Sequence, residues 1–102
     1  MAKRKLPQSV LEYVDHLRRT YKDFQKAYIF GSYAKGCDNI DSDIDIAVIF
    51  DQAFDSFDLQ VNLMKIRRQY DTRIEPHVFP HADFDRSNPL VEEIIDSGVE
   101  LQ

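Results

Sequence analysis

An unbroken apolar run at residues 46–50 (IAVIF) limits most strongly how this chain can fold. A strand that alternates apolar and polar residues covers one face of a sheet, whereas an unbroken run indicates burial on both faces. Both faces of this strand are therefore expected to be buried. Residues 42–45 (SDID) come directly before the run, so the predicted strand spans residues 42–50 and begins with polar side chains.

The remaining elements follow from the spacing of apolar residues and from turn residues. Helices are predicted at residues 7–22, 57–70 and 89–97, and further strands at 27–30 and 73–79. Ser9 and Glu12 fit a capping box in the first helix, and Pro76 favours an edge position or a bulge for the last strand. The order helix, strand, turn, strand, helix, strand, helix predicts a small α/β sandwich. With 102 residues, we expect one domain over residues 1–102.

The net charge and the single cysteine argue against several classes of protein. Thirteen basic and eighteen acidic residues give a net charge of −5, which disfavours RNA or DNA as a partner because phosphates repel an acidic surface. The single cysteine, Cys37, allows no internal disulfide and fits a reducing compartment. No apolar run approaches the roughly 18 residues of a membrane span. We therefore expect a cytoplasmic protein without a membrane segment.

Residues 38–64 contain seven aspartates and neither lysine nor arginine. Like charges at this density repel one another unless solvent or a cation separates them. Asp43 and Asp45 stand two residues apart where the strand begins, so their side chains point to the same face. Paired carboxylates favour a hard cation, and Mg²⁺ recruits substrate phosphates as further ligands. For this pair taken alone, a solvated acidic strand end is the alternative.

A calcium-binding loop does not fit the same aspartates. Asp41, Asp43 and Asp45 match positions 1, 3 and 5 of an EF-hand, but Ile46 stands where glycine is required and Gln52 where glutamate is expected. We therefore reject the EF-hand.

A glycine turn follows the strand at residues 27–30. Gly31 and Ser32 come where that strand ends, and backbone N–H groups at such a turn can hold phosphate oxygens. An ordinary strand-to-helix turn is the alternative. A Walker A loop is excluded, because Cys37 and Asp38 follow Gly36 where lysine and serine or threonine are required.

The two signals together form a specific pattern, Gly31-Ser32-x₃-Gly36-x₅-Ser42-Asp43-x-Asp45. This pattern resembles the signature of the DNA polymerase β-like nucleotidyltransferase superfamily. Within it, the chain is similar to the minimal nucleotidyltransferases (MNT), the MntA-like antitoxin class of prokaryotic toxin–antitoxin operons. The resemblance implies a polymerase β palm-like fold, a small mixed β-sheet with flanking helices. Lys35 departs from the arginine of many members, which keeps the charge and loses bidentate phosphate geometry.

The superfamily uses a third carboxylate from a later strand, and Glu75 is the candidate here. Arg73, Glu75 and His77 share one face of the predicted strand, which fits the wall of an active site. Many members carry aspartate at this place, so Glu75 is a longer variant, and Asp71 is the competitor. The alternative for Glu75 is a surface ion pair with a neighbour such as Arg73. His77 fits either a substrate contact or an ordinary strand position.

The resemblance implies transfer of AMP from ATP to a hydroxyl group. Asp43, Asp45 and Glu75 would hold two Mg²⁺ ions, and the triphosphate would lie against a second set of residues: Gly31, Ser32, Lys35 and Ser42. The short remainder after the third strand predicts that a partner protein or a second copy supplies the acceptor, giving a hetero- or homo-oligomer. The family implies a HEPN-domain partner modified on tyrosine.

Two further functions stay open at the level of sequence. The chain could be a non-catalytic antitoxin that neutralises its partner by contact, or a nucleotidyltransferase acting on a small molecule. The intact Ser42-Asp43-x-Asp45 pattern disfavours the first, and the missing acceptor domain disfavours the second.

Overall fold

The computed structural model describes residues 6–31, 33–34, 43–51 and 56–101. The helices of this part are α1 (Gln8–Thr20), α2 (Ser56–Ile66) and α3 (Pro89–Ser97), with short 3₁₀ turns η1 (Arg67–Gln69) and η2 (His81–Asp83). The strands are β1 (Phe24–Phe30), β2 (Ile44–Phe50), β3 (Ile74–Pro80) and β4 (Val99–Leu101). In the part described, no helix is both long enough and apolar enough to cross a bilayer.

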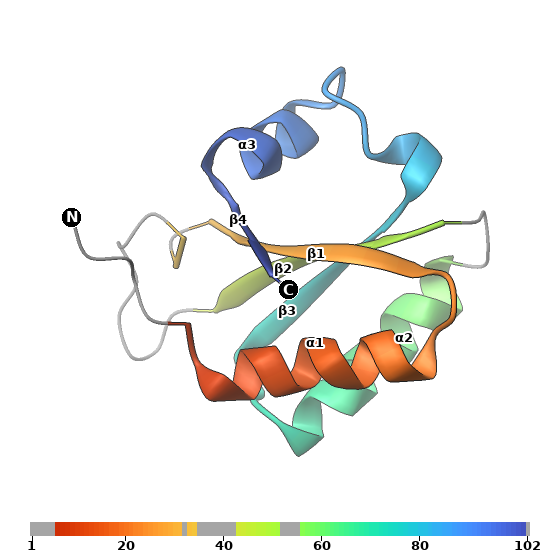
Figure 1. The fold of residues 1–102 in the computed structure, drawn as a ribbon, viewed down its shortest axis with the longest axis vertical. Coiled ribbons are helices and arrows are strands. Elements are labelled where there is room, and N and C mark those ends of the chain that lie inside the picture. Colours follow the sequence, from red (N-terminus) through yellow and green to blue (C-terminus); the bar gives the residue numbers. More distant parts are fainter. Residues whose placement is uncertain (1–5, 32, 35–42, 52–55, 102) are drawn as a thin grey trace.

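The four strands form one mixed sheet in the order β3-β2-β1-β4 (Figure 1). β1 pairs with β2 and with β4 in antiparallel fashion, and β2 pairs with β3 in parallel. A parallel pair needs a crossover connection, which α2 and η1 provide here. The predicted mixed sheet with flanking helices is confirmed.

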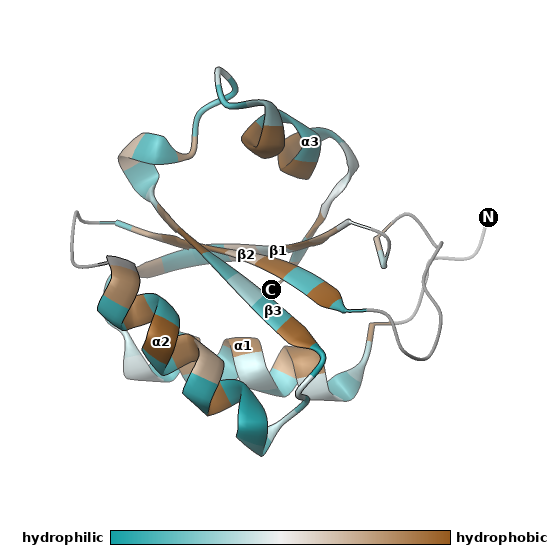
Figure 2. Ribbon diagram, turned by 180° about the vertical axis from the view of Figure 1, so that it is seen from behind, coloured by the Kyte–Doolittle hydropathy of each residue, from teal (hydrophilic) through white to brown (hydrophobic). Residues whose placement is uncertain are grey.

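Helices cover both faces of the sheet, as the unbroken run in β2 predicts. α1 and α2 lie on one face and α3 on the other (Figure 1). Ile44, Ile46 and Val48 pack toward α1 and α2 in the larger core, whereas Ala47 and Ile49 pack with Ile94 of α3. Leu63 of α2 and Ile94 of α3 are fully buried on the two faces, and brown segments mark the apolar residues of both helices (Figure 2). The sheet therefore has one fully covered face and one that α3 covers only in part.

Several predicted elements match closely. The last helix spans residues 89–97 as expected, with the Asn88 side chain accepting from the Leu90 backbone N–H at 2.9 Å. β3 is an edge strand, which fits Pro76, since proline has no N–H for a second neighbouring strand. On β3, Ile74 and Pro76 are buried while Glu75 and His77 lie on the other face, which confirms the predicted alternation for these residues. Arg73, predicted to share the face of Glu75, precedes the strand and pairs with Asp71.

Other expectations about the elements were wrong. β1 begins at Phe24 instead of residue 27, and β4 was not predicted. The helix predicted to end at residue 70 ends at Ile66 and continues as η1. The capping box is absent from α1: its N-cap is Pro7, without a side-chain cap, and the Ser9 hydroxyl donates instead to Asp71 Oδ2 at 3.1 Å.

Candidate active site

Asp45 and Glu75 lie side by side on neighbouring strands. Each is the second residue of its strand, and the parallel register of β2 and β3 pairs them directly. Neighbouring strands are about 4.8 Å apart, so the two backbones hold both carboxylates on one face of the sheet. Their side chains are 31% and 38% exposed. This face is the one that α3 covers in part, so a ligand can reach both groups.

Gly31 directly follows β1 and lies on the opposite side of Asp45 from Glu75, because β1 and β3 flank β2. Its φ of +75° lies in the left-handed region that favours glycine. Phe30 pairs with Asp45 across the antiparallel β1 and β2, which brings Gly31 next to the same carboxylate. A Cβ added at Gly31 would stand only 2.6 Å from Asp45 Oδ2. Only glycine therefore leaves room for the Asp45 carboxylate as it stands.

The structure describes only some of the other residues of the sequence pattern. Asp43 directly precedes β2 and is exposed. The predicted phosphate contacts Ser32, Lys35 and Ser42 lie outside the described residues. The structure thus brings together Gly31, Asp45 and Glu75.

His77 also faces this site. Its Nε2 lies 3.2 Å from Asp45 Oδ1, and its ring packs edge-on against Phe30 with ring centroids 5.2 Å apart. The side chain is 38% exposed. His77 therefore occupies the strip of the sheet between the carboxylates and the apolar cluster under α3.

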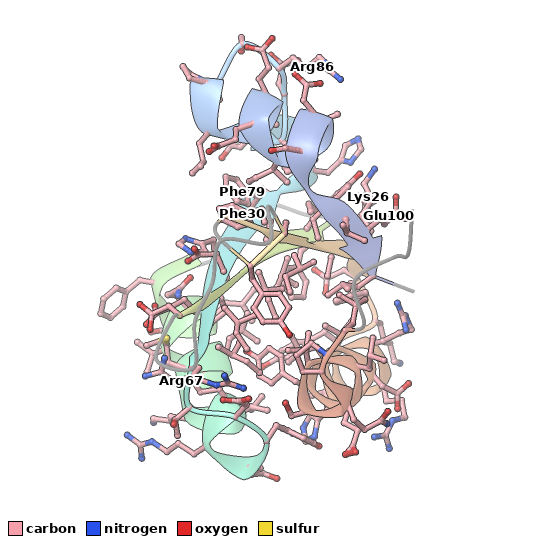
Figure 3. The ribbon with its side chains drawn as sticks, turned by 90° about the vertical axis from the view of Figure 1, so that its left-hand side faces the viewer. Lys26, Phe30, Arg67, Phe79, Arg86 and Glu100 are labelled. Carbon is pink, nitrogen blue, oxygen red and sulfur yellow. The ribbon has the colours of Figure 1, made fainter. Side chains whose placement is uncertain are left out.

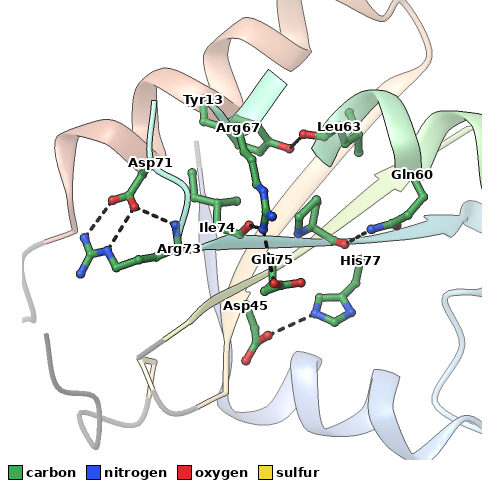
Figure 4. A network of polar contacts seen from close by, with 11 residues as sticks. Tyr13, Asp45, Gln60, Leu63, Arg67, Asp71, Arg73, Ile74, Glu75 and His77 are labelled. Carbon is green, nitrogen blue, oxygen red and sulfur yellow. Dashed lines mark hydrogen bonds and ion pairs between the residues drawn. The ribbon is translucent and has the colours of Figure 1, made fainter. Parts of the chain in front are cut away.

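Arg67 reaches Glu75 from the end of α2, a contact that sequence reasoning missed. Its Nη1 donates to Ile74 O at 2.8 Å and to Glu75 Oε1 at 3.3 Å (Figure 4). Its position at the end of a helix suggested only a favourable interaction with the helix dipole. The available signal was charge order, since Lys65, Arg67 and Arg68 are the first cations after the acidic stretch at residues 38–64.

Asp71, the competitor for the third carboxylate, is engaged elsewhere. It accepts from Arg73 Nη2 at 2.8 Å and from Arg73 Nε at 3.1 Å, as well as from Ser9. The hydrogen bonds from the Arg73 side chain lower the pKa of Asp71 to about 2, against a smaller opposing effect of burial. Arg73 therefore pairs with Asp71, and Glu75 pairs with Arg67.

The donor chemistry of the site suits a hard cation. Asp43, Asp45 and Glu75 offer carboxylate oxygens, which Mg²⁺ prefers. Among residues 6–31, 33–34, 43–51 and 56–101, no three acidic, histidine or cysteine side chains stand close enough to form a ready metal-binding group. The residues present fit Mg²⁺ by type, and a cation would have to draw their oxygens together.

Comparisons with known proteins bear on the family and the fold. The profile of the family described as polymerase beta, nucleotidyltransferase matches residues 12–101. No curated protein matches the sequence. Among solved structures, a mutant form of the MntA–HepT toxin–antitoxin complex is similar at a TM-score of 0.68 and 26% identity, over 96% of this chain and 73% of that chain.

Two further solved structures share the fold. A proposed nucleotidyltransferase from Sulfolobus solfataricus has a TM-score of 0.65 and 23% identity, over 91% of this chain and 76% of that chain. A toxin–antitoxin structure with AMP-PNP has a TM-score of 0.62 and 24% identity, over 94% of this chain and 73% of that chain.

Proposed function

Because this chain belongs to the polymerase β nucleotidyltransferase family, we propose that it transfers AMP from ATP to a hydroxyl group of a partner protein, a tyrosine in the first instance. The observation that carries this proposal is the direct pairing of Asp45 with Glu75, with Gly31 held against Asp45. The site is open on one face of the sheet and acidic, as a metal-dependent phosphoryl site requires.

In the proposed site, Asp43, Asp45 and Glu75 hold two Mg²⁺ ions. When bound, Mg²⁺ supplies charge neutralisation on the triphosphate and lowers the pKa of an acceptor hydroxyl. The residues of this chain orient the reactants: the turn at Gly31, with Ser32, Lys35 and Ser42, binds the triphosphate through N–H and hydroxyl donors and one cation. The acceptor hydroxyl gives up its proton to solvent and its oxygen forms a bond to the α-phosphorus. The bond from that phosphorus to the oxygen shared with the β-phosphorus breaks, and pyrophosphate leaves with the electron pair.

The partner in this proposal is a toxin with a HEPN domain. Support comes from the likeness to the MntA–HepT toxin–antitoxin pair, together with the family resemblance of the sequence pattern. On α2, Phe57 is 74% exposed and Val61, one turn later, 36%, and we place the contact with the toxin on this side of the helix. We place the activity in the cytoplasm, where ATP is available and Cys37 stays reduced.

Radiolabelled ATP and the purified toxin test the reaction. We expect label to transfer to the toxin in the presence of Mg²⁺, and Asp45→Asn or Glu75→Gln to abolish transfer. Asp71→Asn is the matched control, since this acid is paired with Arg73 and should leave transfer intact.

The same experiment separates the alternatives. Toxin neutralisation that survives Asp45→Asn and Glu75→Gln, without label on the toxin, identifies an antitoxin acting by contact. Label that accumulates on a small hydroxyl compound and never on the toxin identifies a small-molecule nucleotidyltransferase. Either outcome would overturn transfer to a protein.

A further inference from the structure

We propose that Arg67 is a positioning residue, which limits the orientations of the Glu75 carboxylate and so favours its binding of a divalent cation. The inference rests on the proposed function, because it concerns the third carboxylate of that site. It assigns a role to a residue outside the sequence pattern, carried by the turn between α2 and β3.

The contacts of Arg67 join the carboxylate to the backbone of its own strand. One nitrogen, Nη1, donates to both Ile74 O and Glu75 Oε1. The backbone contact is the shorter, at 2.8 Å, and the carboxylate contact is 3.3 Å. The guanidinium is thus fixed mainly by β3 itself, and Glu75 is oriented relative to that fixed point (Figure 4). Only Oε1 takes part, which leaves Oε2 for a cation.

Burial makes this arrangement more rigid than a surface ion pair. The Arg67 side chain is 22% exposed, whereas the exposed pairs of Arg19 and Arg86 use side chains that are 69% and 56% exposed. Burial raises the pKa of the nearby Tyr13 phenol, and the charge of Arg67 opposes that rise. Arg67 therefore lies at the edge of the core, with most of its side chain shielded from solvent (Figure 3).

The Arg67 guanidinium has a further N–H donor at Nε. Within the described part of the chain, this Nε is buried and has no hydrogen-bond partner. A bidentate Arg–carboxylate pair would use two nitrogens and both carboxylate oxygens. Arg67 instead makes one long contact to Glu75, so it orients the carboxylate without occupying it.

Two effects of Arg67 on a bound cation oppose each other. The positive charge of Arg67 disfavours binding of a metal cation nearby. Its hydrogen bond restricts the Glu75 side chain beforehand, so less conformational entropy is lost when the cation binds. The repulsion acts through space whatever the length of the hydrogen bond, so the proposal requires that the orienting effect exceed it. Removing a residue that supports a metal-binding carboxylate commonly costs about 10–100-fold in metal affinity. The sign of the change on removing Arg67 therefore tests the inference directly.

A Mn²⁺ titration of the ¹⁵N-labelled full chain measures this sign without relying on activity. Paramagnetic broadening of the β2 and β3 amide signals locates the ion and gives its affinity. We expect Arg67→Gln to weaken Mn²⁺ binding about 10–100-fold and Arg67→Lys to restore part of it. The matched control is Arg68→Gln, which changes the exposed neighbour in the same turn and should leave the affinity within about twofold.

A double-mutant cycle distinguishes positioning from general stability. If Arg67 acts through Glu75, Arg67→Gln should add nothing to the loss already caused by Glu75→Gln. Where Arg67→Gln does not fold, Arg67→Lys carries the test, because it keeps the charge and lacks the planar fork.

The outcomes separate this inference from the proposed function. Unchanged or tighter Mn²⁺ binding in the Arg67 variants, with Glu75→Gln weakened, overturns the positioning role alone. Wild-type protein that binds Mn²⁺ no better than Glu75→Gln overturns the metal site and, with it, the proposed function.

Discussion

Gly31 lies so close to the Asp45 carboxylate that the site has no room for a side chain at residue 31. A Cβ there would lie 2.6 Å from Asp45 Oδ2, and the backbone is left-handed, with φ of +75°. Gly31→Ala should therefore destabilise the fold by about 1–3 kcal/mol through backbone strain and displace Asp45. We expect urea unfolding at a lower midpoint, together with loss of cation binding and of nucleotidyl transfer.

Gly98→Ala is the matched control for this substitution. A Cβ at Gly98 would collide with the Ile94 carbonyl at the end of α3 and lie 3.1 Å from the Ile29 carbonyl of β1, without meeting the Asp45 side chain. It should lower stability and leave cation affinity unchanged. Equal cation affinity in Gly31→Ala and wild type would contradict the role assigned to Gly31.

Mg²⁺ with ATP should raise the melting temperature. A ligand at about 100 times its dissociation constant adds roughly 2.7 kcal/mol to stability, which corresponds to a rise of the order of 10 °C for a domain of this size. Differential scanning calorimetry at constant ionic strength measures the rise. Asp45→Asn should melt at the same temperature with and without Mg²⁺ and ATP. A wild-type melting temperature that does not respond would count against the site.

The Asp71–Arg73 pair predicts a defined loss of stability in acid. The pKa of Asp71 falls from 3.8 to about 2 in the folded chain, mainly through hydrogen bonds from Arg73. Because the folded-state pKa is the lower one, this stabilisation is complete above pH 3.8 and is lost as the pH falls toward 2. Asp71→Asn should cost roughly 1–2 kcal/mol at neutral pH.

Urea unfolding at a series of pH values checks the Asp71 prediction. The difference in unfolding free energy between wild type and Asp71→Asn should shrink between pH 4 and pH 2. A difference that stays constant over this interval would show that the pair contributes nothing through its charge. Cation binding should be the same in both proteins throughout.

Tyr13 should matter for stability alone. Its buried hydroxyl donates to Leu63 O at 2.9 Å and so joins α1 to α2 beneath the sheet. Tyr13→Phe removes this hydrogen bond and should cost about 1 kcal/mol. Chemical denaturation measures the loss, and a parallel Mn²⁺ titration should find unchanged affinity. A change in affinity would mean that the core couples to the site through Arg67.

Much of the fold could be predicted because burial leaves a direct pattern in the sequence. The run at residues 46–50 required cover on both faces, and α1, α2 and α3 provide it. The three residues of β4 carry no such pattern, since a strand this short is defined only by its pairing with β1. The start of β1 was missed for a similar reason, because Gln25 and Lys26 are polar and the strand bulges between Phe24 and Lys26.

The site was predictable where it depends on local spacing and not where it depends on tertiary contacts. The alternation of strand side chains was enough to put Glu75 and His77 on one face of β3, whereas the joint action of Asp43 and Asp45 stays a prediction. Ser9 bonds to Asp71, 62 residues away, although its local sequence suggests a capping box. Arg67 likewise contacts Glu75 across a chain reversal. Contacts of this kind depend on how the chain packs in three dimensions, and no fixed spacing in the sequence predicts them.

The Asp45–Glu75 pairing has a consequence for how this domain can be altered. The hydrogen-bonded ladder between β2 and β3 sets the distance between the two acids. The segment that connects the two strands does not. Loop extension costs little free energy, roughly 0.6 kcal/mol per doubling of length. An acceptor-recognition module could therefore be grafted between Phe50 and α2, and the spacing of the acids would stay as the ladder sets it.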